Sequence, residues 1–144
     1  MNIKIETKVS VPFDKVKKAF VDREGKLLKY LLPLGTKILH YKGVRRGAIL
    51  KIKLPFSGKL KFKIITYKVT KLYLYFNDII QEGKIFGAGF WSHRHAIKKR
   101  KNHVIIEDDI TFTTKNKLKD KLLYVFLLPV FLMRKIKYKL YFWR

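Results

Sequence analysis

The chain has 144 residues, enough for one domain with a substantial hydrophobic core. Its hydrophobic fraction of 48% and aromatic fraction of 15% exclude a disordered chain, and the absence of cysteine excludes disulfides, thiolate metal sites and cysteine nucleophiles. The 34 basic residues outnumber the 10 acidic ones and give a formal net charge of +24. Most of them are lysine, which favours a solvated basic surface over a reader of base edges, where arginine is the usual contact.

The N-terminal segment predicts a strand followed by two short helices. Apolar and polar residues alternate through residues 3–9, which is the period of a half-buried strand. This segment has no continuous apolar run that would mark a secretory signal, so we expect a cytoplasmic protein. Pro12 precedes apolar residues at helical spacing, which predicts a helix from Phe13 to about Gly25. Residues 26–32 predict a second short helix, which ends at the next proline.

The middle of the chain predicts a series of antiparallel strands. Six segments with strand periodicity are separated by short turns, at residues 36–41, 48–54, 59–67, 72–77, 90–98 and 103–113. In several of them apolar residues alternate with lysines, so one face of the sheet is expected to be apolar and the other basic. Residues 78–89 contain three glycines and predict a corner or a bulge.

The C-terminal segment predicts one long helix, capped by Asn116, running to about Phe142 and kinked at Pro129. Its predicted apolar face consists of Leu118, Leu122, Leu123, Phe126, Leu127, Val130 and Phe131. The uncharged stretch 122–133 is too short to cross a bilayer. We therefore expect a helix buried against the sheet, with an interfacial membrane helix flanked by basic residues as the alternative.

This order of elements is an α+β plan, and we expect residues 1–144 to form one ligand-binding domain. A strongly curved sheet cannot cover its concave side with its own side chains, so the long helix is expected to pack there. The space that remains between the helix and the sheet would be an apolar cavity of the kind that binds small molecules.

Short motifs along almost the whole chain carry a family resemblance. They are Val11-Pro12 after the opening strand, Phe76-Asn77-Asp78 leading to Gly83, Trp91-Ser92-His93-Arg94-His95, Ile106-Glu107-Asp108-Asp109-Ile110, and the tyrosine-rich segment 134–142. With these the chain resembles the SRPBCC superfamily of START-like and pollen-allergen-like helix-grip proteins, and within it the bacterial ligand-binding and polyketide-cyclase-like group. The resemblance implies a helix-grip fold, in which a curved antiparallel sheet wraps around a long C-terminal helix and holds a hydrophobic ligand. It does not identify the ligand, because the relatives include lipid carriers, hormone receptors, cyclases and dehydratases.

The densest polar constellation lies on the last two predicted strands and consists of Trp91, His93, His95, Asp108 and Asp109. A two-residue hairpin centred on residues 100–101 would set His93 opposite Asp108. Asp108 shares a face with apolar residues, and His93 would supply the partner that a buried carboxylate needs. The pair is either structural, a ligand anchor or an acid and base. His93 and His95 point the same way, but a metal site needs a third convergent ligand and Asp108 alone is a weak candidate, so we expect no metal and no cofactor.

The leading interpretation is a non-catalytic module that binds a hydrophobic small molecule, lipid-like or polyketide-like. The predicted ligand-binding residues are Phe62, Phe76, Trp91, His93, His95, Ile106, Asp108, Ile110, Phe126 and Val130. One alternative is an enzyme of cyclase or dehydratase type, in which His93, His95 and Asp108 move protons. A further alternative is a basic protein that associates weakly with an anionic membrane or nucleic acid.

Overall fold

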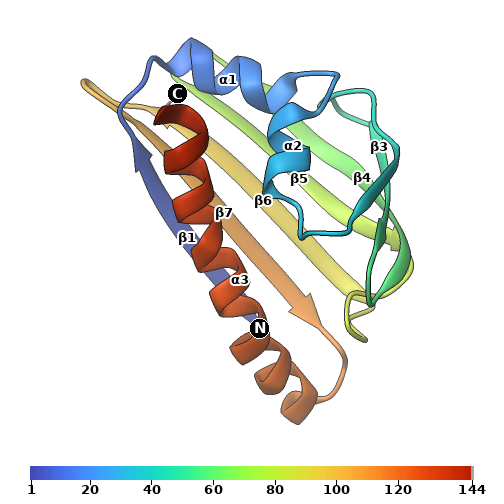
Figure 1. Ribbon diagram of the computed structural model, residues 1–144. Helices are drawn as coiled ribbons and strands as arrows, with labels where there is room; N and C mark the ends of the chain where they lie inside the picture. Colours follow the sequence, from blue (N-terminus) through green and yellow to red (C-terminus); the bar gives the residue numbers. More distant parts are fainter. Residues whose placement is uncertain (144) are drawn as a thin grey trace.

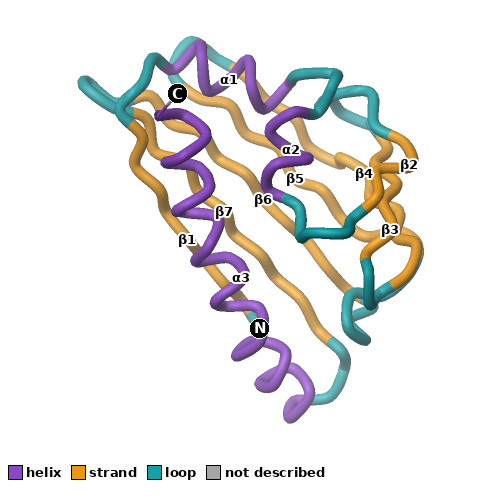
Figure 2. Tube along the Cα trace, in the orientation of Figure 1, coloured by secondary structure: helices purple, strands orange, loops and turns teal. Residues whose placement is uncertain are grey.

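In the computed structural model, which describes residues 1–143, a seven-stranded antiparallel sheet curves around a long C-terminal helix (Figure 1). The elements in chain order are β1 (Asn2–Val9), α1 (Phe13–Val21), α2 (Lys26–Leu31), β2 (Lys37–His40), β3 (Ile49–Leu54), β4 (Gly58–Val69), β5 (Tyr73–Glu82), β6 (Phe90–Lys99), β7 (Val104–Thr113) and α3 (Lys117–Trp143). The strands lie in the order β1-β7-β6-β5-β4-β3-β2, and the helices lie on the same side of the sheet (Figure 2). The predicted helix-grip architecture is confirmed.

The first two elements form where the residue pattern predicts them. In β1 the inward-facing residues Ile3, Ile5, Thr7 and Val9 are buried, while the residues that alternate with them are exposed. In α1, Phe13 and Phe20 are buried on one side of the helix. The period of two and the helical spacing each turn one apolar side toward the same core.

The bulge predicted within residues 78–89 is present, because the register of β5 against β4 shifts between Ile80 and Glu82, whereas the corner begins only at Gly83, after β5 ends at Glu82. The pairing of β5 with β4 shifts register twice along its length, so this part of the sheet is irregular but still paired. The chain leaves the sheet at Gly83, where φ is +89°. Glycine is suited to this conformation because it has no Cβ.

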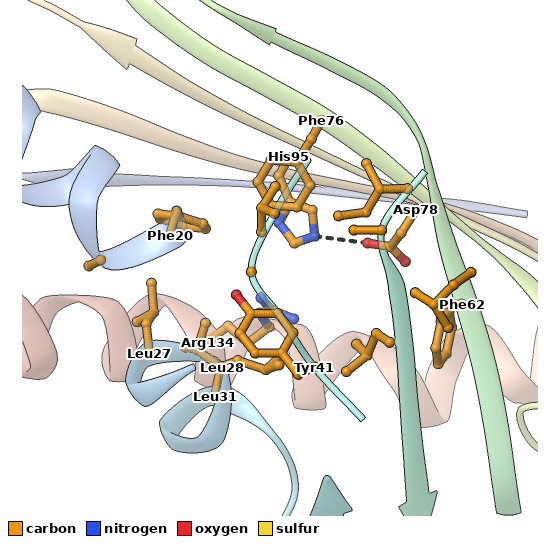
Figure 3. Close-up of a pocket in the computed structure, with 17 residues that line it drawn as sticks. Phe20, Leu27, Leu28, Leu31, Tyr41, Phe62, Phe76, Asp78, His95 and Arg134 are labelled. Carbon is orange, nitrogen blue, oxygen red and sulfur yellow. Dashed lines mark ion pairs between the residues drawn. The ribbon is translucent and has the colours of Figure 1, made fainter. Parts of the chain in front are cut away.

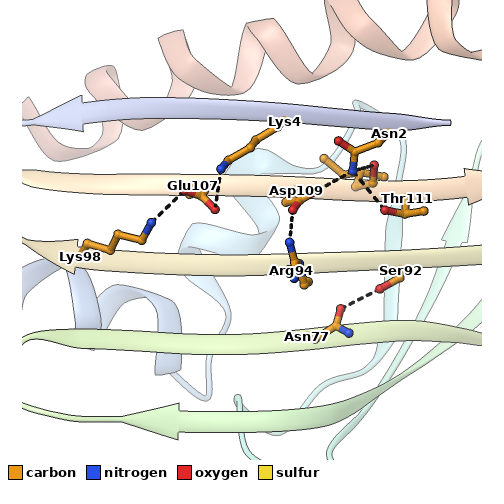
Figure 4. A network of polar contacts seen from close by, with 10 residues as sticks. Asn2, Lys4, Asn77, Ser92, Arg94, Lys98, Glu107, Asp109 and Thr111 are labelled. Carbon is orange, nitrogen blue, oxygen red and sulfur yellow. Dashed lines mark hydrogen bonds and ion pairs between the residues drawn. The ribbon is translucent and has the colours of Figure 1, made fainter.

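The outer face of the sheet carries paired charges (Figure 4). Glu107 on β7 lies 3.0 Å from Lys98 and 3.5 Å from Lys4. Its neighbour on the same face, Asp109, pairs with Arg94 and also accepts a hydrogen bond from Asn2. Asp109 is therefore separated from Asp108 by the thickness of the sheet, and it is not part of the polar constellation predicted with the two histidines.

α3 begins as predicted and stays one helix across Pro129. The backbone nitrogen of Lys119 donates to the Asn116 side chain at 3.0 Å, which is the expected N-cap. Just before the helix, the backbone nitrogen of Thr114 donates to the Asp120 carboxylate at 2.6 Å and ties the end of β7 to the first turn.

Four of the seven residues predicted for the apolar face of α3 are exposed: Leu118, Leu122, Phe126 and Val130. Leu123, Leu127 and Phe131 are buried against the sheet. Phe126 and Val130, which were predicted to line the ligand cavity, are 54% and 40% exposed. Apolar residues surround much of this helix, so their spacing alone does not show which side packs on the sheet. Across residues 1–143, no helix combines the length and the apolar character needed to cross a bilayer.

The close approach at Gly83 predicts that alanine is more destabilising at Gly83 than at Gly87. A Cβ at Gly83 would lie 2.6 Å from the backbone oxygen of Lys59, whereas a Cβ at Gly87, with the same φ of +89°, would meet nothing within 4 Å. Both changes to alanine carry the strain of a positive φ, and only Gly83→Ala adds a clash. In urea unfolding, Gly83→Ala should lose at least about 1 kcal/mol more stability than Gly87→Ala. Equal losses would contradict the close packing at this corner.

Candidate functional site

A layer of polar side chains crosses the core between two apolar clusters. Its members come from five elements, and we call them the polar layer: Thr7, Asp78, His93, His95, Asp108 and Arg134. On β7 the inward-facing neighbours of Asp108 are Ile106 and Ile110, and these two belong to different apolar clusters. On α3, Phe131 belongs to one cluster and Tyr138 to the other. The polar layer therefore lies where the two clusters meet.

Asp108 is the centre of the polar layer and is only 1% exposed. Its Oδ1 atom lies 2.8 Å from His93 Nε2, 3.3 Å from His95 Nδ1 and 3.4 Å from Arg134 Nη2. The Tyr138 hydroxyl donates to the same oxygen at 3.4 Å, and Arg134 Nη2 donates to that hydroxyl at 2.9 Å. One carboxylate thus joins β6, β7 and α3.

The predicted contact between His93 and Asp108 exists, but the predicted register is wrong by two residues. The hairpin turn spans residues 100–103 and sets His95 opposite Asp108, while His93 lies opposite Ile110. A shift of two residues leaves every side chain on its own face. His93 therefore still reaches the carboxylate, as a diagonal neighbour.

The two histidines differ in their affinity for a proton. Burial, together with the charge of His95, lowers the pKa of His93 to about 4, although Asp108 opposes this. Burial also disfavours the charged form of His95, but hydrogen bonds and charge from Asp108 and Asp78 outweigh it and raise its pKa. The His95 Nε2 atom lies 3.4 Å from Asp78, and the two imidazole rings are 3.8 Å apart. A single proton on this pair resides on His95.

The charges of the polar layer balance one another. Burial acts to raise the pKa of Asp108, but Arg134 and the two histidines hold it well below its ordinary value. Asp108 in turn raises the pKa of Arg134 above the ordinary range despite burial. When His95 is protonated, the charges of Asp78, Asp108, Arg134 and His95 sum to zero. This balance limits the desolvation penalty of burying the four groups.

Several atoms of the polar layer have no hydrogen-bond partner within the described chain. They are Thr7 Oγ1, His95 Nδ1, Asp108 Oδ2 and Arg134 Nε. His95 Nδ1 is near Asp108 but lacks the direction of a hydrogen bond. Unsatisfied buried atoms are rare in folded proteins and mark places where water or a polar group of a ligand binds.

A cavity of about 80 Å³ ends at the polar layer (Figure 3). Its polar lining is Tyr41, Asp78, His95 and Arg134. The apolar lining comes mainly from α1, α2 and strands β3 to β5 and includes Phe20, Leu27, Leu28, Leu31, Leu50, Phe62, Ile64 and Phe76. The cavity was predicted between the C-terminal helix and the sheet, and this position is wrong. It lies between α2 and the sheet, and α3 contributes only Arg134.

Three of the ten predicted ligand-binding residues line this cavity: Phe62, Phe76 and His95. Trp91 and Ile110 pack in the apolar cluster at the other side of the polar layer, and Ile106 is buried in the nearer one. His93 and Asp108 belong to the polar layer but do not border the cavity, and Phe126 and Val130 are exposed.

Several residues of the site were not among the predicted ligand-binding residues: Thr7, Tyr41, Asp78, Arg134 and Tyr138. Asp78 was assigned to the corner after β5, although it stands in one of the motifs that carried the resemblance. Arg134 and Tyr138 are four residues apart and therefore share one side of a helix. This spacing is the signal that could have placed both of them beside the predicted carboxylate.

Asp78, His93 and His95 are also close enough to be considered as metal ligands, with donor atoms all within 4.8 Å of one another. Two histidines and a carboxylate are a known set for divalent transition metals. However, the buried guanidinium of Arg134 lies next to the same groups and opposes a further positive charge. The geometry thus favours a hydrogen-bonded network with a proton on the histidine pair over a metal site.

Comparison with known proteins gives relatives in structure only. No family model and no curated protein sequence matches the chain. Norcoclaurine synthase from Thalictrum flavum, solved with dopamine and hydroxybenzaldehyde, matches with a TM-score of 0.67 at 19% identity over 97% of this chain and 85% of that one. Ara h 8.0201 matches with a TM-score of 0.62 at 19% identity over 95% of both chains.

Protein MLL2253 from Mesorhizobium loti matches with a TM-score of 0.66 at 12% identity, over 97% of this chain and 96% of that one. The chain has the same helix-grip fold as these structures. The predicted resemblance is confirmed at the level of the fold. Because a helix-grip protein of such low identity can carry many different sites, the chemistry must be argued from the residues of this chain.

The polar layer predicts a large effect of removing its guanidinium. Arg134→Leu would leave the buried Asp108 carboxylate without its main counter-charge, which should cost about 3–5 kcal/mol of stability. The exposed Arg46→Leu is the matched control and should change stability by less than about 0.5 kcal/mol. Urea unfolding of both variants measures this. Similar small losses in the two variants would show that Arg134 does not compensate a buried charge.

The opposite pKa shifts of His93 and His95 predict that the two residues change the stability of the fold with pH in opposite directions. The unfolded chain protonates histidine near pH 6.5, whereas folded His93 does so at about 4, so stability falls as the pH drops through this window. Folded His95 keeps its proton above pH 6.5, so its contribution is complete below that pH and is lost as the pH rises through its folded pKa. The slope from His93 approaches about 1 kcal/mol per pH unit within its window.

Urea unfolding at a series of pH values tests these slopes with His93→Gln and His95→Gln. The first variant should flatten the acidic side of the profile and the second the alkaline side. Profiles that keep both slopes in both variants would contradict this distribution of the proton.

Proposed function

We propose that this protein binds a hydrophobic small molecule, lipid-like or polyketide-like, in the cavity between α2 and the sheet. The observation that carries the proposal is an apolar cavity that ends at buried polar atoms without partners. Apolar walls supply affinity through the surface they remove from water, and a few fixed polar groups orient the ligand. This chain provides both at one place.

The polar end of the cavity offers mainly hydrogen-bond donors. Arg134 Nε is buried and unpaired, and the guanidinium cannot lose its proton in a protein. Burial raises the pKa of Tyr41 to about 12, so its hydroxyl stays protonated and is able to donate. His95 completes the set. The ligand is therefore expected to place an acceptor, such as a carbonyl, hydroxyl or carboxylate oxygen, at this end.

The size of the cavity limits which ligands can bind without a movement of the protein. About 80 Å³ is well below the roughly 300–1,000 Å³ of ligand sites for drug-sized molecules, so a small ring or a short acyl group fits first. A larger ligand requires displacement of α2, a helix of six residues. Its end is held by Lys137, whose Nζ lies 3.4 Å from the carbonyl oxygens of Leu31 and Leu32.

The enzymatic alternative receives less support from the same geometry. A cyclase or dehydratase mechanism with His93, His95 and Asp108 requires these groups to reach the substrate. Of these three groups only His95 lines the cavity, and Asp108 is held by four partners, His93, His95, Arg134 and Tyr138. The arrangement suits orientation of a bound molecule better than proton transfer by a triad.

Binding is tested with naphthol, which joins an apolar double ring to one hydroxyl, by fluorescence titration of the purified protein. Ala48 lines the cavity, whereas Ala96 lies on the outer face of β6 beside Lys98. Ala48→Phe should fill the cavity and weaken binding by at least about tenfold, and Ala96→Phe should leave it within about twofold.

Circular dichroism of both variants shows whether the fold is kept. Native mass spectrometry of gently purified protein gives a second measurement, in which a bound hydrophobic molecule is expected in the wild type and is lost in Ala48→Phe. The proposal is wrong if naphthol does not bind saturably, or if the two alanine variants bind it equally.

A further inference from the structure

We infer that the outward side of α3 is a docking surface for an anionic lipid membrane. This surface is separate from the ligand cavity. It is formed by large apolar side chains that remain exposed on the folded chain, and we call it the outer stripe: Leu118, Leu122, Val125, Met133, Ile136 and Leu140. Figure 1 shows α3 lying over the sheet near β1 and β7, with its outward side free of other elements.

The outer stripe follows the helical repeat. Its members recur three, four or eight residues apart, and Pro129 stands at the midpoint of the longest interval. At about 100° per residue, these positions fall on one side of the helix, opposite the buried residues Leu127 and Phe131. α3 therefore has two apolar sides, and the sheet covers one of them. Exposed apolar patches of this length mark interaction sites.

Further apolar side chains extend the outer stripe at its ends and edge. Trp143 in the last turn is 84% exposed. Near the start, the ring of Phe126 packs edge-on against Phe86, with ring centroids 5.1 Å apart, and both rings are partly exposed. Phe86 belongs to the β5–β6 connection and holds a positive φ of 48°. Aromatic side chains are favoured where a membrane meets water.

The charges around the outer stripe decide which partner fits. Exposed Lys121 and Lys139 lie about 80° to one side of its centre, and exposed Lys119 lies about 80° to the other. An apolar face bordered by lysines is the pattern of a helix that lies in a membrane interface, because long lysine side chains reach the head groups while the apolar face enters the acyl region. Anionic lipid also attracts the net charge of +24.

A second copy of this chain fits the same surface poorly. Two outer stripes packed together would bring both sets of flanking lysines face to face, and each copy carries a net charge of +24. Like charges at this density oppose association. An anionic bilayer presents the opposite charge and needs no shape complementarity beyond a flat surface.

Vesicle binding tests the inference, with Trp143 as a reporter because Trp91, the other tryptophan, is 5% exposed. Vesicles of phosphatidylcholine with roughly 30% phosphatidylglycerol should bind the protein and shift the tryptophan emission to the blue. Pure phosphatidylcholine vesicles should bind it at least about tenfold less. Added salt should weaken binding to the anionic vesicles.

The variant Leu122→Gln, Met133→Gln, Ile136→Gln removes three members of the outer stripe and keeps residues that favour a helix. It should lose at least about tenfold in partitioning to the anionic vesicles. A matched control carries the same number of changes at exposed apolar residues away from α3: Leu39→Gln, Val69→Gln and Leu72→Gln. The control should stay within about twofold of the wild type.

Two results overturn the inference. Equal partitioning of the outer-stripe variant and the control would show that lysine charge alone attracts the vesicles. A dimer in analytical ultracentrifugation that dissociates in the outer-stripe variant would show that a second copy covers this surface. The cavity-filling variant Ala48→Phe should bind vesicles like the wild type, so this test and the test of ligand binding fail independently.

Discussion

The buried carboxylate of Asp108 constrains the rest of the structure. A charge in the core is tolerated only when its partners are fixed, and here they come from β6 and from α3. The contact with Arg134 favours one position of α3 along the sheet, because sliding the helix by one turn would part Arg134 from Asp108 and leave the carboxylate with the two histidines alone. The apolar residues of α3 cannot set this position, since they occur on two sides of the helix. Burial of apolar surface thus holds the helix on the sheet, and the ion network determines where it sits.

The same network gives the cavity its polar end. Its inner part, around His93 and Asp108, is sealed between the two apolar clusters, whereas His95, Asp78 and Arg134 border the open space. An arrangement made only for stability would pair every buried polar atom, and this one leaves several unpaired. Departures from full satisfaction concentrate at functional sites. This contrast, more than the likeness in fold to ligand-bound structures, supports a binding role.

All ten elements of the fold could be predicted from the sequence, because the apolar period is regular and the turns are rich in glycine, proline and lysine. The hairpin register could not, since a shift of two residues keeps the same side chains inside and alternation does not distinguish the two pairings. The site was predicted only in part. Asp108 could be recognised as an acid on an apolar strand face. Arg134 could not be distinguished from the other basic residues that follow the uncharged stretch of α3. Phe126 was placed inside because its hydrophobicity does not reveal that the sheet covers the opposite side of α3.

The central claim is that the buried network ends at a ligand cavity, and its most direct test is a titration of the four histidine rings by NMR during addition of naphthol. His95 lines the cavity, whereas His40 and His103 are partly exposed and lie outside the lining residues. The account predicts that the ring signals of His95 shift saturably while those of His40 and His103 stay in place. Shifts confined to His40 or His103, or saturable binding that leaves His95 unmoved, would contradict it.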